Sequence, residues 1–180
     1  MAPARIFTIG HSTRPFEEFA ELLKREGVTH LADVRSFPSS RRYPHFNKAL
    51  LVPALAAKGI AYTHFPALGG RRAARKDSRN TAWKNSGFRG YADYMETTPF
   101  SEGLDSLRLA APAAPTAIMC AEAVPWRCHR SMISDALVAG GDEVMHILDS
   151  GLKPHRLTSF GRVENGAVRY DTAPDLDLFG

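Results

Sequence analysis

The sequence predicts one α/β domain with three layers: a mostly parallel sheet of about five strands and helices on both faces. Short apolar runs alternate along the chain with amphipathic stretches of helical length, which favours this class. The runs are nearly continuous in apolar residues, as is typical of parallel strands buried on both faces. A length of 180 residues is enough for one sizeable core.

The predicted strands are five short apolar runs, the first of which ends at Gly10. They span residues 4–9, 29–34, 61–65, 116–120 and 143–148. The first helix is predicted at residues 14–27, where Phe16, Phe19 and Leu23 recur at helical spacing and Gly27 acts as a stop.

A second helix is predicted within residues 47–59 with Gly59 as its stop, although Pro53 implies that only the part beyond it is regular. Two short helices are expected at residues 89–97 and 100–111, and a last helix at residues 126–141. Residues 66–87 form a long basic loop, which in a small domain is usually functional or mobile.

The domain organisation that we expect is a single unit over residues 1–180. Its core covers about residues 5–148, and residues 149–180 form a C-terminal extension with weak periodicity. Within this extension, residues 168–171 could add an edge strand.

The composition is that of a soluble globular protein, with 44% hydrophobic and 23% charged residues. Lys and Arg outnumber Asp and Glu by 23 to 19, which favours anionic partners without choosing between phosphate metabolites and nucleic acid. No leader or membrane span is recognisable, and two cysteines cannot make a disulfide framework. We therefore expect a cytoplasmic protein with reduced thiols, no membrane contact and no cofactor.

A ligand cleft is expected at the carboxyl ends of the strands, where open α/β sheets bind their ligands. The residues that follow the predicted strands are polar, cationic or glycine-rich. They are Gly10-His11-Ser12, Arg35, residues 66–70, Ala121-Glu122 and Asp149-Ser150.

Cys120 is the first candidate in this cleft, in the segment "CAEAVPWRCHRS" (residues 120–131). A cysteine between a strand and a helix N-terminus tends to have a depressed pKa and can act as a thiolate nucleophile. Arg130 would then bind a transferred anionic group. The alternative is that Cys120 is one more small buried residue at a strand end.

Cys128 is predicted in the first turn of the last helix, beside His129. Facing the loop, it could resolve an oxidised Cys120; facing inward, it would belong to the core. The spacing of Cys120, Cys128 and His129 does not match paired zinc ligands, so no metal site is predicted.

The segment "GHST" (residues 10–13) follows the first strand. Ser12 or Thr13 could cap the first helix. Alternatively, His11 would point into the cleft as a base, an acid or a phosphate ligand, with Ser12 beside it.

Two basic loops complete the candidate site. In residues 33–47, Asp33 and Arg35 could form an ion pair, while Arg41, Arg42 and Tyr43 combine cations with a ring, a mix that suits phosphate and a stacked base. Gly69-Gly70 and the cations after them repeat this combination. The alternative is a solvated basic surface with rings in the core.

The ordered motifs resemble the bacterial domain-of-unknown-function family 488 over roughly Arg5 to Leu148. They are "TIGHST", "ADVRSFPSSRRYPHFN", "YTHFPALGG", "GFRGYADYM" and "IMCAEAVPWRCHRSMIS". This resemblance implies an α/β domain and assigns no reaction.

A fainter similarity is to rhodanese-like and Cys-phosphatase domains, carried by "LADVRS" and the Cys120 segment. It implies sulfur or phosphoryl transfer. However, six residues separate Cys120 from Arg127 and nine separate it from Arg130, and Glu122 adds a negative charge where an anion would bind.

Three functions remain open at this level. The first is an enzyme for a small anionic or nucleotide-like substrate, a cysteine-dependent transferase or hydrolase with Cys120 as nucleophile or redox thiol. Its candidate proton-transfer groups are Glu122, His11 and His129, and its candidate binding residues are Ser12, Arg35, Arg41, Arg42, Tyr43, Gly69, Gly70, Cys128 and Arg130. The second is a nucleic-acid-binding module that uses loops 35–46 and 69–91, with Tyr43, Trp83, Phe88 or Tyr91 stacking on bases. The third is a structural role.

Overall fold

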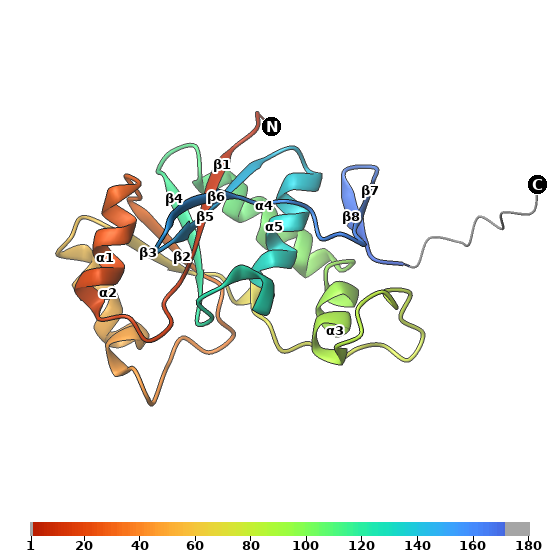
Figure 1. Cartoon of the computed structure of the whole chain (residues 1–180), viewed down its shortest axis with the longest axis horizontal. Helices are drawn as coiled ribbons and strands as arrows, with labels where there is room; N and C mark the ends of the chain where they lie inside the picture. Colours follow the sequence, from red (N-terminus) through yellow and green to blue (C-terminus); the bar gives the residue numbers. More distant parts are fainter. Residues whose placement is uncertain (1, 172–180) are drawn as a thin grey trace, which may run out of the picture.

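The computed structural model describes residues 2–171 and contains a six-stranded sheet in the order β3-β2-β4-β1-β5-β6. The first five strands in chain order are parallel and occupy the five predicted runs. They are β1 (Arg5–Gly10), β2 (His30–Asp33), β3 (Ala61–His64), β4 (Thr116–Cys120) and β5 (Glu143–Leu148). Figure 1 shows this sheet between its helices.

The estimate of about five strands misses one. The strand β6 (Gly151–Pro154) pairs antiparallel with β5 across a tight turn in which Gly151 has a φ of 122°. Its residues are mostly exposed at the sheet edge, so they lack the apolar run that marks the other strands.

The expectation of a further edge strand at residues 168–171 is wrong. The strand β8 (Ala167–Arg169) pairs only with β7 (Arg162–Glu164), in a separate two-stranded hairpin. Asn165 and Gly166 form its turn with φ angles of 51° and 75°, the conformation that two-residue hairpin turns favour. The end of the predicted extension, residues 172–180, lies outside the described residues.

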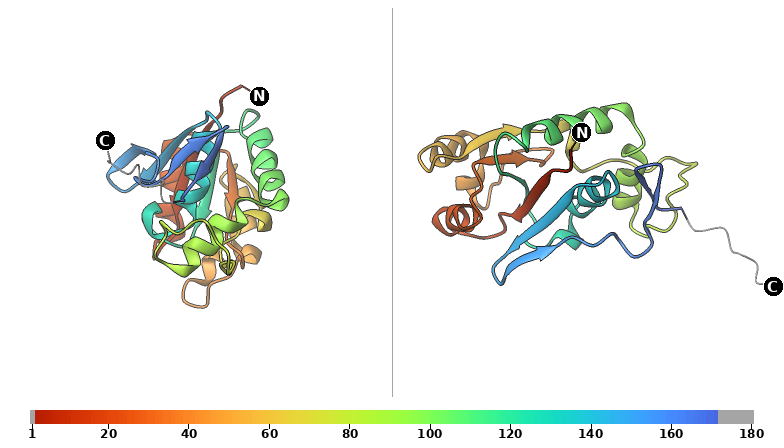
Figure 2. Two further views of the ribbon diagram at one scale, coloured as in Figure 1. Left: turned by 90° about the vertical axis from the view of Figure 1, so that its right-hand side faces the viewer. Right: turned by 90° about the horizontal axis from the view of Figure 1, so that it is seen from above.

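The helices form the two outer layers of the predicted three-layer fold. They are α1 (Phe16–Arg25), α2 (Lys48–Ala56), α3 (Ser86–Tyr94), α4 (Thr98–Ala110) and α5 (Arg130–Ala139). Apolar residues of α1 and α2 pack on one face of the sheet, and those of α4 and α5 pack on the other (Figures 1 and 2). The cores are therefore two, one on each side of the sheet.

Two helix predictions need correction. Pro53 lies inside α2, which is helical on both sides of it. The helix loses one backbone hydrogen bond there, but Pro53 is exposed and its ring does not disturb the core. The last helix begins at Arg130, because Pro125–Arg127 form a short 3₁₀ turn, η3, and Cys128 after it is extended with φ −140° and ψ 150°. Cys128 is therefore not in the first turn of α5.

The segment after β6 is fastened to α5 by one buried carboxylate. Asp135 accepts hydrogen bonds from His155 Nε2, from the backbone N–H and hydroxyl of Thr158, and from the Tyr170 hydroxyl, at 2.6–3.0 Å. No helix within residues 2–171 has the length and apolarity needed to cross a membrane.

Candidate functional site

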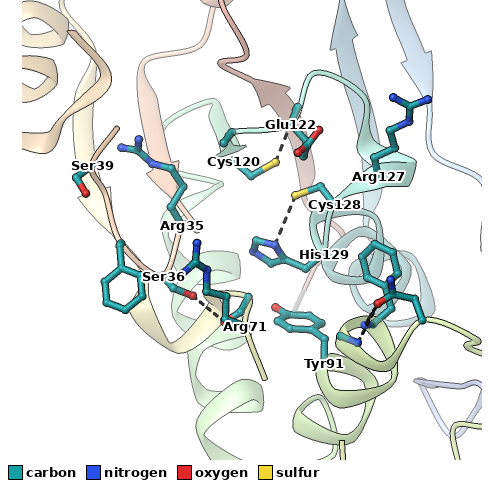
Figure 3. Close-up of a pocket in the computed structure, with 16 residues that line it drawn as sticks. Arg35, Ser36, Ser39, Arg71, Tyr91, Cys120, Glu122, Arg127, Cys128 and His129 are labelled. Carbon is teal, nitrogen blue, oxygen red and sulfur yellow. Dashed lines mark hydrogen bonds between the residues drawn. The ribbon is translucent and has the colours of Figure 1, made fainter. Parts of the chain in front are cut away.

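A cavity of about 660 Å³ lies beyond the carboxyl ends of β2 and β4. Its walls come from residues 35–39, Gly70 and Arg71, the start of α3, and residues 120–122 and 127–129 (Figure 3). The volume is within the range of small-molecule sites. A cavity therefore lies where the sequence predicted a ligand cleft.

Cys120 ends β4 at the cavity, and its side chain is 2% exposed. Its Sγ is 3.8 Å from the carbonyl oxygen of Glu122. Burial by itself raises the pKa of this thiol, but the Cys128 S–H and the charge of Arg130 outweigh burial, and the pKa of Cys120 is lowered. These interactions shift Cys120 toward the thiolate form relative to an isolated cysteine.

Arg130 is a buried cation without an acidic partner among residues 2–171. Its side chain is 1% exposed, and Nη2 donates to the carbonyl oxygens of Glu122 and Ala123 at 3.3 Å each. Its Nε and Nη1 have no hydrogen-bond partner among residues 2–171, nor does any carboxylate there form an ion pair with it. A buried charge is costly unless it is compensated, and a thiolate at Cys120 supplies the opposite charge.

Cys128 lies between η3 and α5 and is 6% exposed. Its Sγ accepts the backbone N–H of Arg130 at 3.5 Å. Interaction with Cys120 is the main cause that raises the pKa of Cys128 well above the usual value, and burial adds to it. Of the two thiols, Cys128 is the one that keeps its proton.

His129 is held in one tautomer. Its Nε2 lies 2.9 Å from the carbonyl oxygen of Val34, which can only accept, so Nε2 carries the proton. The other nitrogen, Nδ1, is then an acceptor, and it lies 3.5 Å from Cys128 Sγ. Burial lowers the pKa of His129 to about 4, so the ring is neutral at pH 7.

Glycines let these segments approach one another. A Cβ at Gly10 would lie 1.8 Å from the Glu122 carbonyl oxygen, so the loop after Cys120 passes directly over the end of β1. A Cβ at Gly70 would lie 3.0 Å from His129 Nδ1, and one at Gly69 would lie 2.7 Å from Ser36 Oγ. Only Gly70 of this last pair lines the cavity.

His11 and Ser12 lie behind the cavity wall. The Nδ1 of His11 donates to the Ser12 carbonyl, its Nε2 is 3.5 Å from Arg35 Nη1, and its ring stacks on Phe46 at 4.3 Å. The predicted helix cap by Ser12 or Thr13 is wrong, because α1 begins after Pro15 without a side-chain cap. Instead, the Ser12 N–H donates to the Ala121 carbonyl, with Ser12 at φ 46°.

Arg35 lines the cavity, but its guanidinium is already bound. It donates to the Asp33 carboxylate at 2.8–3.2 Å and to the Phe46 carbonyl oxygen at 2.8 Å. The ion-pair interpretation of Asp33 and Arg35 is confirmed. Arg41, Arg42 and Tyr43 are not in the cavity wall; the two arginines are exposed and Tyr43 is half-buried.

Two cations that were not named individually as binding residues stand at the cavity instead: Arg71, one of the predicted cations after Gly70, and Arg127. Arg71 and Arg127 are exposed, line the cavity, and form no ion pair with any carboxylate of residues 2–171. Arg71 lies over the ring of Phe37, 5.6 Å from its centre, and Phe37 is 66% exposed. The exposed Phe37 ring is the feature that marks this part of the cavity. Its exposure cannot be read from the sequence, because a single Phe in a loop is equally compatible with burial.

Other cations and rings of the basic loops are engaged within the protein. Arg75 pairs with Glu96 at 2.7 Å, and Arg72 lies over the Tyr94 ring at 3.7 Å. Tyr91 is 1% exposed, and Trp83 packs against Phe88, Phe160 and Tyr170. Within the described part of the chain, no three His, Cys, Asp or Glu side chains are grouped so that they could hold a metal ion.

Comparison with known proteins gives one match. The family model described as "Domain of unknown function DUF488" matches residues 15–137, about two thirds of the chain. No curated protein and no solved structure matches. The fainter similarity to rhodanese-like and Cys-phosphatase domains has no support from these comparisons.

Proposed function

We propose that this chain, which belongs to the DUF488 family of domains of unknown function, is a cysteine-dependent enzyme for a small anionic or nucleotide-like substrate. The substrate binds in the cavity of about 660 Å³, and Cys120 attacks it as a thiolate.

One observation carries the proposal: the buried Arg130 guanidinium has two nitrogens without hydrogen-bond partners among residues 2–171. A thiolate at Cys120 compensates this charge, whereas a neutral thiol leaves it buried and unbalanced. A purely structural cysteine does not need such a neighbour, because neutral buried thiols pack as small apolar groups.

The cavity supplies the remaining parts of such a site. Arg71 and Arg127 attract an anionic group, and the Phe37 and Phe88 rings cover an apolar or planar part of the ligand. Glu122 lines the cavity two residues from Cys120 and can exchange a proton with solvent because it is exposed. In this arrangement Arg35, held by Asp33, shapes the wall.

The test compares alkylation of Cys120 by iodoacetate and by iodoacetamide, which differ mainly in charge. Peptide mapping by mass spectrometry follows each cysteine as a function of pH. We expect the midpoint for Cys120 below the free value of about 8.5 and a faster reaction with iodoacetate. The double variant Arg71→Gln/Arg127→Gln removes the preference for the anion, whereas Lys24→Gln, exposed in the last turn of α1, keeps it. A Cys120 midpoint at or above the free value would refute the proposal.

A second candidate, nucleic-acid binding, rests on the exposed Phe37 ring beside Arg71, with the exposed Arg41 and Arg42 in the same loop as Phe37. It predicts that mixed-sequence single-stranded oligonucleotides bind at low salt and that affinity falls steeply as salt rises. The variant Phe37→Ala tests the stacking contribution. Flat titrations at low salt would remove this candidate.

A further inference from the structure

The two thiols form one unit at the base of the cavity. Both side chains line it, and Figure 3 shows them pointing toward each other. The loop that begins at Ala121 and includes η3 returns the chain so that Cys128 sits beside the strand-end Cys120. Both cysteines are free thiols, and Cys120 is 2% and Cys128 is 6% exposed.

Cys128 also has a base of its own. The His129 Nδ1 is an acceptor 3.5 Å from Cys128 Sγ, and its tautomer is fixed by the Val34 carbonyl oxygen. A neutral imidazole in this position can relay the proton of the Cys128 thiol to a departing sulfur, but with a pKa of about 4 it does not hold that proton at pH 7. An enzyme that used Cys120 alone would have no evident use for this second thiol and its base.

From this geometry we propose that Cys120 and Cys128 form a redox-active dithiol that reduces a small anionic disulfide, with His129 relaying the Cys128 proton to the leaving thiolate. This inference rests on the proposed function, since Cys120 remains the nucleophile, and it adds the substrate class. A sulfur substrate is the one for which the second thiol is useful, because a thiol can displace a product from Cys120 by attacking a sulfur–sulfur bond.

The first step forms a mixed disulfide. The Cys120 thiolate attacks one sulfur of the substrate, the new sulfur–sulfur bond forms, and the other half of the substrate leaves as a thiolate. Arg71 and Arg127 hold the anionic groups of the substrate at the cavity.

In the second step, Cys128 attacks the mixed disulfide at Cys120. The Cys128 proton moves to His129 Nδ1, the Cys128 thiolate attacks Cys120 Sγ, and the remaining half of the substrate leaves with the proton from His129. The products are two substrate thiols and a Cys120–Cys128 disulfide, so two electrons pass from the protein to the substrate. An external dithiol reductant restores the thiols.

The charges around the two sulfurs are consistent with this order of steps. Interaction with Cys120 is the main cause of the raised pKa of Cys128, and the mixed disulfide removes the thiolate charge on Cys120. Arg130 acts on both sulfurs, and its effect on Cys128 lowers the pKa. The negative charge can therefore pass from Cys120 to Cys128 beside the same buried cation.

The experiment uses the reduced full chain and the anionic aromatic disulfide dithiobis(nitrobenzoate), whose coloured thiolate reports each release. We expect wild type to release two thiolates per chain and to end unlabelled, with an intramolecular disulfide seen by mass spectrometry. Cys128→Ser, and Cys128→Ala as a second variant, release one and retain a label on Cys120. His129→Asn slows the second release more than the first, by roughly 10-fold or more. Circular dichroism establishes that each variant is folded.

The outcomes separate the two proposals. If Cys120 does not react with this probe, or reacts with it no faster than with the neutral dipyridyl disulfide, both proposals fail. If Cys120 is labelled quickly but wild type keeps the label or both cysteines become labelled, the dithiol mechanism is wrong and the nucleophile stands. Equal slowing of both releases by His129→Asn would remove the histidine from the second step.

Discussion

At the scale of single residues, Arg130 determines the chemistry expected of Cys120. It is 1% exposed, and no carboxylate of residues 2–171 pairs with it. The variant Arg130→Gln removes the charge that stabilises the thiolate, so we expect the alkylation midpoint of Cys120 to rise by about 1–3 pH units. Lys24→Gln is the matched control because Lys24 is an exposed cation of α1. An unchanged midpoint in a folded Arg130→Gln protein would contradict this role.

Gly10 is the residue on which the backbone of the site depends. A Cβ there would lie 1.8 Å from the Glu122 carbonyl oxygen, which is backbone and cannot rotate away. We expect Gly10→Ala to destabilise the protein by roughly 1–3 kcal/mol in urea unfolding, because the loop after Cys120 must move. Gly140→Ala is the control, since its Cβ would have 3.4 Å to its nearest neighbour. Equal stability of the two variants would show that the loop shifts without cost.

At the scale of elements, α5 is tied to the C-terminal segment through Asp135. Its carboxylate accepts four hydrogen bonds and is fully buried. We expect Asp135→Asn to lower the free energy of unfolding by roughly 3–5 kcal/mol, because an amide nitrogen cannot accept from the Tyr170 or Thr158 hydroxyl. Asp105→Asn, an exposed position of α4, should change it by less than about 0.5 kcal/mol. A small loss at Asp135 would mean that residues 155–170 are held by other contacts.

The element boundaries show where sequence patterns stop being informative. The central parallel strands were predictable because burial on both faces requires a mostly apolar run, as in Ala117–Cys120. The two edge strands differ in this respect: the predicted run of β3 contains Tyr62 and Phe65, whereas β6 is short, mostly exposed and has Leu152 as its one large apolar side chain, so it was not predictable. Nor was the start of α5, because Pro125 fits the first turn of an α-helix as well as the 3₁₀ turn that it occupies.

At the scale of the whole molecule, parallel topology is what made the site partly predictable. Strand ends meet at one edge of the sheet, so Cys120, Glu122 and Arg35 were expected together and do line one cavity. The same rule wrongly placed His11 in the cavity. The rule predicts that the residues after β1 lie near the ligand edge of the sheet, but it does not predict in which direction a side chain points. Arg71 was expected only as one of the cations after Gly70, and Arg127 was not selected, because which cations lack an acidic partner depends on long-range packing.

The buried histidines make the stability of the whole fold depend on pH. Burial lowers the pKa of His11 and of His129 to about 4 and that of His146 to about 3, against about 6.5 in an unfolded chain. The unfolded state therefore binds more protons below pH 6.5, and stability is lost as pH falls. Between about pH 7 and pH 5 we expect urea unfolding to report a loss of roughly 1–2 kcal/mol per histidine. His146→Gln, if folded, should reduce this loss by roughly the share of one histidine, whereas a flat profile over the same interval would show that these rings bind protons in the native state as they do in the unfolded chain.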